Sequence, residues 1–210
     1  GEGLGDVLSI ARSSNKTWAV GTKGLFMFGL ADGKTWTVKA TPLTSDLIKV
    51  VPISDAIAYV IAKDGTVLTT SNAGVTWGQN FGLKNKFSAN VDIADIACST
   101  AEWVALTSDG LVYSSTDKGA NWAQLSFTTS TISSFALNAN DLYFAGALGT
   151  LYKLGANNKL TVLPANANIN LKNLAFNGAS SQAIAADNNG NIYTSSVTAS
   201  PLAWAKQTNI

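Results

Sequence analysis

Residues 91–125, VDIADIACSTAEWVALTSDGLVYSSTDKGANWAQL, hold one complete copy of the pattern that decides the fold. The copy opens with an apolar residue, two variable positions and an apolar pair, Ile93 to Ala97, which indicate a short strand. Two more β-rich runs flank Asp109-Gly110, a strong hairpin signal in which both turn residues are expected to have positive φ. A further run begins at Trp122. The stretch therefore predicts a sheet of short antiparallel strands.

The same pattern recurs along the whole chain. Its first strand begins at Val7, Leu47, Ile93, Ile132 and Leu171. The hairpin glycine recurs in step, as Gly24, Gly65, Gly110, Gly149 and Gly190. A period near 40 residues indicates an array of identical units, and no window shows a helical apolar period. We predict an all-β, five-bladed β-propeller with four antiparallel strands per blade. It forms a single domain over residues 1–210, with blades at about 7–46, 47–90, 91–131, 132–170 and 171–210.

The sequence leaves the closure of the ring open. The repeat starts with its innermost strand and ends with its outermost, so no strand crosses from one terminus into the other terminal blade. Side chains of blades 1 and 5 could pack against each other, aided by residues 1–6. Alternatively, the five units form an open arc that another chain completes.

Composition excludes several classes of protein. The 210 residues include no histidine and one cysteine, only 13% are charged, and the formal net charge is +1. These counts predict no metal site, no cofactor and no nucleic-acid partner. Cys98 is predicted to be a free thiol in the core. The longest apolar run, 56–62, is too short to insert into a membrane. Asp187 to Asn191 resembles half a calcium loop but coincides with a predicted hairpin turn.

The turn before the fourth strand carries the most specific motif. Ser115, Asp117, Gly119 and Trp122 resemble the Asp box of the BNR repeat, Ser-x-Asp-x-Gly-x-Thr-Trp. Two relaxed copies hold Thr70, Asn72, Gly74 and Trp77 in the second blade, and Gly33 and Trp36 in the first. The box is expected to be structural: Asp or Asn caps turn N–H groups, glycine supplies positive φ, and tryptophan packs over the hairpin. The resemblance implies the fold and no particular activity.

Families that share the Asp box differ in the residues that their functions require. Sialidases hold substrate with three arginines, whereas this chain has only Arg12, and its glutamates are only Glu2 and Glu102. The chain is therefore predicted not to be an enzyme. It also resembles photosystem II assembly-factor-like proteins, which are larger. Those proteins have seven blades and present an arginine-rich patch, and these two traits are missing here.

The remaining class is a binding or display module. Low charge and small size favour a phage virion component, such as a capsid decoration, fibre or tail protein, located in the virion or at an extracellular surface. A secreted bacterial lectin-like module and a photosystem assembly-factor-like scaffold are the alternatives. The partner would be another protein or a surface glycan, and the chain could form a homo-oligomer.

Two sets of residues are candidates for contact. Phe81, Lys84, Lys86 and Phe87 lie in the longest connection, 78–90, and are candidates for a partner protein unless the phenylalanines fold back onto a blade. Trp18, Tyr59, Trp103 and Tyr143 are candidates for glycan contact. Their equivalent places in predicted second strands favour blade packing instead.

Overall fold

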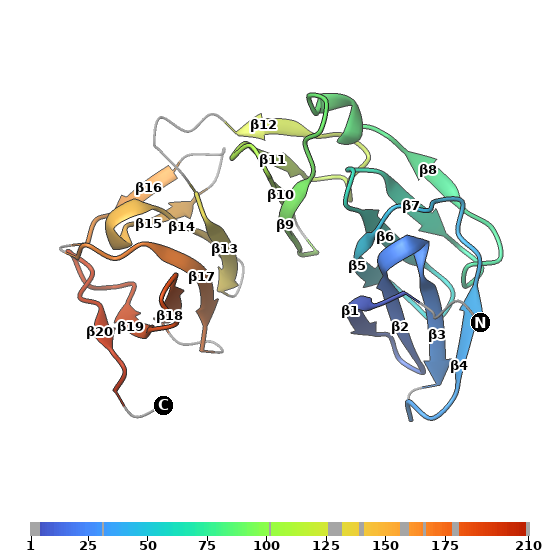
Figure 1. Cartoon of the computed structure of the whole chain (residues 1–210), viewed down its shortest axis with the longest axis horizontal. Coiled ribbons are helices and arrows are strands. Elements are labelled where there is room, and N and C mark those ends of the chain that lie inside the picture. The colour runs from blue at the N-terminus through green and yellow to red at the C-terminus, as the bar shows by residue number, and fades with distance from the viewer. Residues whose placement is uncertain are drawn as a thin grey trace.

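The chain folds into five sheets that stand side by side along an arc (Figure 1). The computed structural model describes residues 5–30, 32–100, 102–125, 132–138, 141–155, 160–165, 167–177 and 181–208. Each sheet has four antiparallel strands, hydrogen-bonded in chain order. The first strand of each sheet lies on the concave side of the arc and the fourth on the convex side (Figure 1). The predicted all-β, five-bladed propeller is confirmed.

The blades contain the following strands. Blade 1 holds β1 (Val7–Arg12), β2 (Lys16–Gly21), β3 (Phe26–Leu30) and β4 (Trp36–Lys39). Blade 2 holds β5 (Leu47–Pro52), β6 (Ala58–Ala62), β7 (Val67–Thr70) and β8 (Gly78–Asn80). Blade 3 holds β9 (Ile93–Cys98), β10 (Trp103–Thr107), β11 (Val112–Ser115) and β12 (Ala123–Leu125). Blade 4 holds β13 (Ser134–Asn138), β14 (Asp141–Ala145), β15 (Leu151–Leu154) and β16 (Leu160–Leu163). Blade 5 holds β17 (Leu171–Phe176), β18 (Gln182–Asp187), β19 (Ile192–Ser196) and β20 (Ala205–Lys206).

Helical structure within the described ranges is confined to three single 3₁₀ turns, η1 (Thr22–Gly24), η2 (Lys84–Lys86) and η3 (Ala147–Gly149). None of them is long and apolar enough to cross a membrane.

The hairpins between second and third strands show two turn geometries. In blades 1 and 4 both turn residues have positive φ, as Lys23 with Gly24 and Leu148 with Gly149. The Asp-Gly and Asn-Gly pairs of blades 2, 3 and 5 differ from the expected turn type, because only their glycine has positive φ.

In the β6–β7 hairpin only Gly65 has positive φ, at 85°, while Asp64 does not. The N–H of Gly65 donates to the carbonyl of Ala62 at 3.0 Å, and the N–H of Ala62 donates to the carbonyl of Thr66 at 2.9 Å. This is a longer loop in which a turn is followed by one left-handed glycine. The Asp64 side chain accepts the N–H of Thr66 at 2.9 Å, so the acid caps the turn instead of adopting positive φ.

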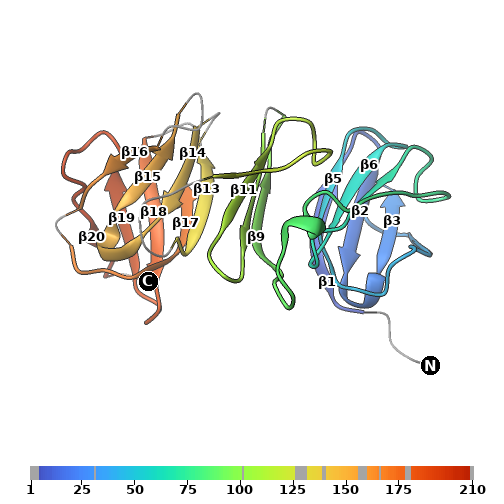
Figure 2. The same cartoon turned by 90° about the horizontal axis from the view of Figure 1, so that it is seen from above.

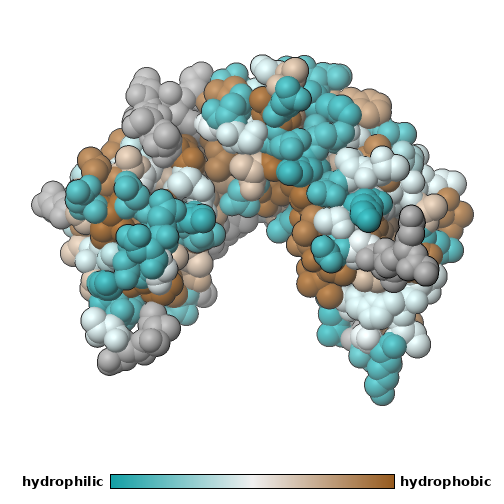
Figure 3. Space-filling model, in the orientation of Figure 1, coloured by the Kyte–Doolittle hydropathy of each residue, from teal (hydrophilic) through white to brown (hydrophobic). Residues whose placement is uncertain are grey.

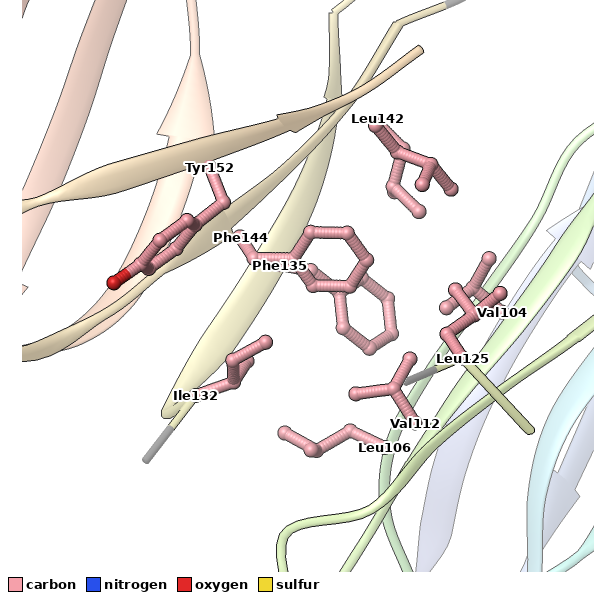
Figure 4. Packing of buried hydrophobic residues seen from close by; sticks show 10 residues of the cluster. Val104, Leu106, Val112, Leu125, Ile132, Phe135, Leu142, Phe144 and Tyr152 are labelled. Carbon is pink, nitrogen blue, oxygen red and sulfur yellow. The ribbon is translucent and has the colours of Figure 1, made fainter. Parts of the chain in front are cut away.

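Apolar side chains fill the space between neighbouring blades. Blades 1 and 2, 2 and 3, 3 and 4, and 4 and 5 are each joined by one buried cluster. Figure 4 shows the cluster between blades 3 and 4, where Phe135 and Phe144 face Val104 and Val112. Each interior blade therefore buries both faces of its sheet, which explains its nearly continuous apolar strands.

The arc does not close on itself. The space-filling view shows a wide opening between the first and last blades, and the view from above places them at opposite ends of the row (Figures 2 and 3). Among the described residues, the four buried clusters join four pairs of neighbours, and no fifth cluster joins blade 1 to blade 5. Of the two alternatives left open by the sequence, the structure shows the open arc.

Candidate functional site

One pocket lies where the innermost strands of the first three blades begin. It has a volume of about 410 Å³. Its walls come from β1, from the start of β5, from the start of β9, and from two turns between second and third strands. The lining residues are Leu8, Thr22, Asp46, Ile48, Lys49, Lys63, Ile93, Ala94, Asp95 and Ile96. A ligand here would touch three blades at once.

Hydrogen bonds donated by backbone N–H groups link the blades around this pocket. The N–H of Lys23 in blade 1 donates to the carboxylate of Asp46 in blade 2 at 3.2 Å. The N–H of Ile93 in blade 3 donates to the carbonyl of Lys63 in blade 2 at 2.8 Å. These bonds fix the angle between successive blades, so the pocket is largely preformed.

The pocket combines an apolar floor with charges of both signs. Lys63 forms an ion pair with Asp92, with 3.5 Å between Nζ and the carboxylate. Lys49 forms no ion pair with any described residue, although its charge acts on Asp95. Burial raises the pKa of Asp95, against the opposing effect of the Ile96 N–H that donates to it at 2.8 Å. Mixed charge over apolar side chains suits a polypeptide better than a phosphate or a sugar.

A second pocket of about 390 Å³ lies between blades 2 and 3, at the far ends of their innermost strands. It is lined by Val51, Pro52, Ile53, Cys98, Ser99, Thr100, Trp103 and Lys118. Burial raises the pKa of the Cys98 thiol to about 12, so this cysteine is protonated and unreactive at neutral pH. No group of three or more potential metal ligands occurs among the described residues.

The turn that resembles an Asp box forms a closed hydrogen-bond network. The Asp117 carboxylate accepts the Ser115 hydroxyl at 2.8 Å, the Asn121 N–H at 2.8 Å and the Asn121 side-chain amide at 2.7 Å. These bonds lower the pKa of Asp117, led by the Asn121 N–H. The Trp122 indole donates to the carbonyl of Gly119 at 3.1 Å. The polar groups are thus occupied within the turn, which favours the structural role expected from the sequence.

The two relaxed copies are arranged in similar ways. In blade 2 the Thr70 hydroxyl accepts the N–H of Gly74 at 2.8 Å, and Asn72 accepts the N–H of Thr76 at 2.9 Å. The Trp77 indole reaches back to the carbonyl of Ala40 in the preceding connection at 3.2 Å. In blade 1 the Trp36 indole donates to the carbonyl of Gly33 at 3.1 Å.

The 78–90 connection mostly folds back onto the protein. Lys84 forms an ion pair with Asp64, with 2.6 Å between Nζ and the carboxylate, and half-buried Phe87 packs against Tyr113. Lys86 is exposed, and its carbonyl accepts the Tyr113 hydroxyl at 3.4 Å. Phe81 remains 42% exposed. Partner contact through this connection stays a prediction, and it would depend on Phe81.

The aromatic residues considered for glycan contact lie in three interblade clusters and are mostly buried. Trp18, Trp103 and Tyr143 lie in three different interblade clusters, while Tyr59 stacks edge-on against Trp103 at 5.2 Å between ring centroids. Trp103 faces the preceding blade and Tyr59 the following one, so the two are not at equivalent positions as the sequence suggested. Buried rings offer no face to a sugar, and their placement favours blade packing.

Sequence reasoning missed the pocket at the innermost strands. One signal pointed to it: an aspartate directly precedes the first strand in blades 1, 2 and 3, as Asp6, Asp46 and Asp92. The carbonyls of these aspartates accept N–H groups from the turns of their own blades, those of Thr22, Lys63 and Ser108. The recurrence marks the end of the strands at which the pocket forms.

Comparison with known proteins identifies the family. The model of the family described as photosynthesis system II assembly factor YCF48 matches residues 4–209. The chain belongs to the YCF48 family. No match was found among curated protein sequences.

Solved structures agree with the propeller fold. YCF48 from Cyanidioschyzon merolae is 16% identical, with a TM-score of 0.78, and the match covers 94% of this chain and 70% of that one. YCF48 bound to D1 peptide is 18% identical, with a TM-score of 0.68, covering 97% and 67%. The WD40 β-propeller domain of Doa1 is 14% identical, with a TM-score of 0.63, covering 94% and 67%.

The family match corrects one expectation and reorders the others. Location in a virion or at an extracellular surface is wrong, because the chain belongs to the YCF48 assembly-factor family. The comparisons likewise favour the photosystem assembly-factor-like alternative over the phage virion component. Low charge was a poor guide to location, because it reflects a repeat made of short polar turns and apolar strands, whatever the source of the protein.

Proposed function

We propose that this chain is a non-catalytic binding scaffold of the YCF48 type, which holds a segment of a client protein in the pocket at the first three innermost strands. The observation that carries the proposal is a preformed pocket that spans three blades and belongs to a chain of the assembly-factor family. A YCF48 structure with a D1 peptide bound supports a polypeptide as the kind of ligand.

The lining of the pocket supports the same class of ligand. Leu8 and Ile48 offer apolar contact, Lys49 offers a cation without an ion-pair partner among the described residues, and Asp95 offers an acceptor. Polypeptides present these three kinds of group together, whereas a sugar site would need exposed aromatic faces. The chain has a single arginine, so lysines would supply the positive charge that the assembly-factor resemblance assigns to arginines.

Binding of a fluorescently labelled D1 peptide tests the proposal. We expect saturable binding by the chain, and Leu8→Ser to weaken it about tenfold, because losing one half-exposed apolar contact costs about 1–2 kcal/mol. Leu8 is 47% exposed, so the substitution should leave the thermal unfolding temperature unchanged. Fluorescence anisotropy measures the Kd.

Val162→Ser is the matched control. Val162 is also a half-exposed aliphatic strand residue, but it lies on β16 in blade 4, outside the pocket. Its substitution should leave the Kd within about twofold. Absence of peptide binding, or equal weakening by both substitutions, would contradict the proposed site.

A further inference from the structure

The second pocket lies at the opposite ends of the strands that line the first. β5 and β9 run from one pocket to the other. Their early residues, such as Ile48 and Ile93, line the first pocket, and their last residues, Pro52 and Cys98, line the second. The two pockets share no lining residue in the part of the chain that the structure describes. The second pocket is therefore a separate place for a ligand.

The turns between first and second strands meet differently at successive blade junctions. Between blades 1 and 2, Asp55 accepts the Ser13 hydroxyl at 2.6 Å and the Asn15 N–H at 2.9 Å. The corresponding turn of blade 3, residues 99–102, has no aspartate. Its Ser99 and Thr100 line the second pocket together with Ile53 of the blade 2 turn. Hydrogen bonds thus link the turns at one junction, while a cavity of about 390 Å³ lies between them at the next.

Hydrogen bonds fix the turns on both sides of this cavity. On the blade 2 side, the N–H of Ile53 donates to the carbonyl of Ile57 at 2.8 Å. On the blade 3 side, Lys118 lies between Asp117, which accepts the Asn121 N–H at 2.8 Å, and Gly119, whose N–H donates to the Ser115 hydroxyl at 2.8 Å. The pocket therefore exists before a ligand binds, as small-molecule pockets usually do.

The lining of the pocket combines one cation with apolar walls. Lys118 is the only charged residue among the described residues that line it, and it is exposed and forms no ion pair with a described residue. The carboxylates of Asp55 and Asp117 accept hydrogen bonds from their own turns. The Cys98 thiol adds no charge, because burial raises its pKa to about 12. The apolar lining residues are Val51, Pro52, Ile53, Cys98 and Trp103.

We propose that this pocket is a second binding site, for a small organic carboxylate with an apolar body. The carboxylate would pair with Lys118, and the apolar body would lie against Pro52, Ile53 and Trp103. A cavity of about 390 Å³ is within the usual range for small-molecule sites, about 300–1,000 Å³. The first pocket differs because its lining carries charges of both signs. The second site does not depend on the peptide site.

Binding of 2-naphthoate, compared with the neutral 2-naphthamide, tests the proposal by isothermal titration calorimetry. We expect one molecule of 2-naphthoate to bind per chain with a Kd of about 1 mM or below, and 2-naphthamide to bind about fivefold more weakly. Lys118→Ala should remove this difference by weakening 2-naphthoate alone. Ala73 holds the same place in the blade 2 turn with φ of 54°, against 58° for Lys118, so alanine fits the backbone there.

Lys34→Ala is the matched control, because Lys34 is an exposed lysine in the corresponding turn of blade 1, outside the pocket. It should leave both Kd values within about twofold. Ile53→Ser should weaken both ligands about fivefold, since it removes an apolar wall. Equal affinity for the two ligands, equal weakening by Lys118→Ala and Lys34→Ala, or no binding at about 5 mM ligand would overturn the proposal.

The labelled D1 peptide distinguishes this site from the peptide site. It should bind Lys118→Ala with an unchanged Kd, and 2-naphthoate should not displace it. Displacement would place both ligands in one pocket and overturn the second site. Binding of 2-naphthoate that responds to Lys118→Ala, in a chain that does not bind the D1 peptide, would support this site while contradicting the peptide site.

Discussion

Blades 3 and 5 reach the same four-stranded sheet with different connections between the third and fourth strands. In blade 3 the turn satisfies its polar groups internally, and Gly119 lies against the ring of Trp103 and against Val67 of blade 2. In blade 5 the corresponding connection lacks the motif and bonds to its neighbour instead. The Trp204 indole donates to the carbonyl of Gly149 in blade 4 at 2.7 Å, and the Leu202 N–H to that of Pro164 at 2.7 Å.

The difference shows that a blade can form without the turn motif. Blade 5 keeps an aspartate network, but at the hairpin between β18 and β19, where Asp187 accepts the N–H groups of Asn189 and Asn191 at 2.8 and 2.9 Å. What both blades share is the apolar pattern of the first strand, with Ile93 and Ile96 in one and Leu171 and Leu174 in the other. Packing between blades therefore specifies the sheet, which can form without this turn motif.

The substitution with the largest expected effect disturbs the contact between the turn and the core of blade 3. Gly119 has φ of +83°, and a Cβ there would lie 2.9 Å from the buried Trp103 ring. Gly119→Ala should cost about 1–2 kcal/mol for the left-handed backbone and about 1–3 kcal/mol for the clash. Gly110 has a similar φ of +86° with open space around it. Gly110→Ala should therefore cost only about 1–2 kcal/mol, for the left-handed backbone. Thermal unfolding of the two variants measures the difference. Equal losses of Tm would refute the packing role of Gly119.

A smaller effect is expected on the pH dependence of stability, through the aspartates of the two networks. Hydrogen bonds from Asn121 and Ser115 lower the pKa of Asp117, and hydrogen bonds led by the Asn191 side chain lower that of Asp187. A carboxyl whose folded pKa is lowered stabilises the protein above its unfolded value, 3.8 for aspartate, and this contribution disappears as pH falls through the folded pKa. Asp117→Asn and Asp187→Asn should each lower the Tm at pH 7 and reduce its fall between pH 5 and about pH 2.

Thermal unfolding across this pH range checks the prediction, and the double variant should show the flattest profile. Lys34→Gln provides a control for surface charge, since Lys34 is exposed and makes no ion pair with a described residue. Profiles of the aspartate variants that run parallel to that of the unsubstituted chain would contradict a role for either carboxylate in acid sensitivity.

The sequence predicts the blades well because each depends on local signals. The recurring first strand and the hairpin glycines, such as Gly65 and Gly110, determine strand positions within a few residues. The orientation of side chains was harder to predict: Trp103 lies one position away from the register of Trp18, and one residue in a strand reverses the face it occupies. The pocket at Lys49 depends on angles between blades, which no short stretch of sequence encodes.

Whether the ring closes could not be predicted for a related reason. Ile10 and Leu174 are aliphatic residues at the same place in the repeat, yet one is exposed and the other buried. An aliphatic residue at this place in the repeat indicates that the position is suited to packing. Only the three-dimensional arrangement shows whether a neighbouring blade covers it. The family match then shows a family that composition alone did not identify, and it favours the assembly-factor-like alternative over the virion component.

Thiol labelling of Ile10→Cys and Leu174→Cys is the most direct test of the open arc. The native Cys98 should react slowly, because burial raises its pKa to about 12, and its rate is measured in the unsubstituted chain. The thiol introduced at position 10 should react at least about tenfold faster than that at position 174, since a buried site reacts only after local opening. Equal labelling rates, or protection of position 10 in the isolated chain, would contradict an arc whose first blade is uncovered.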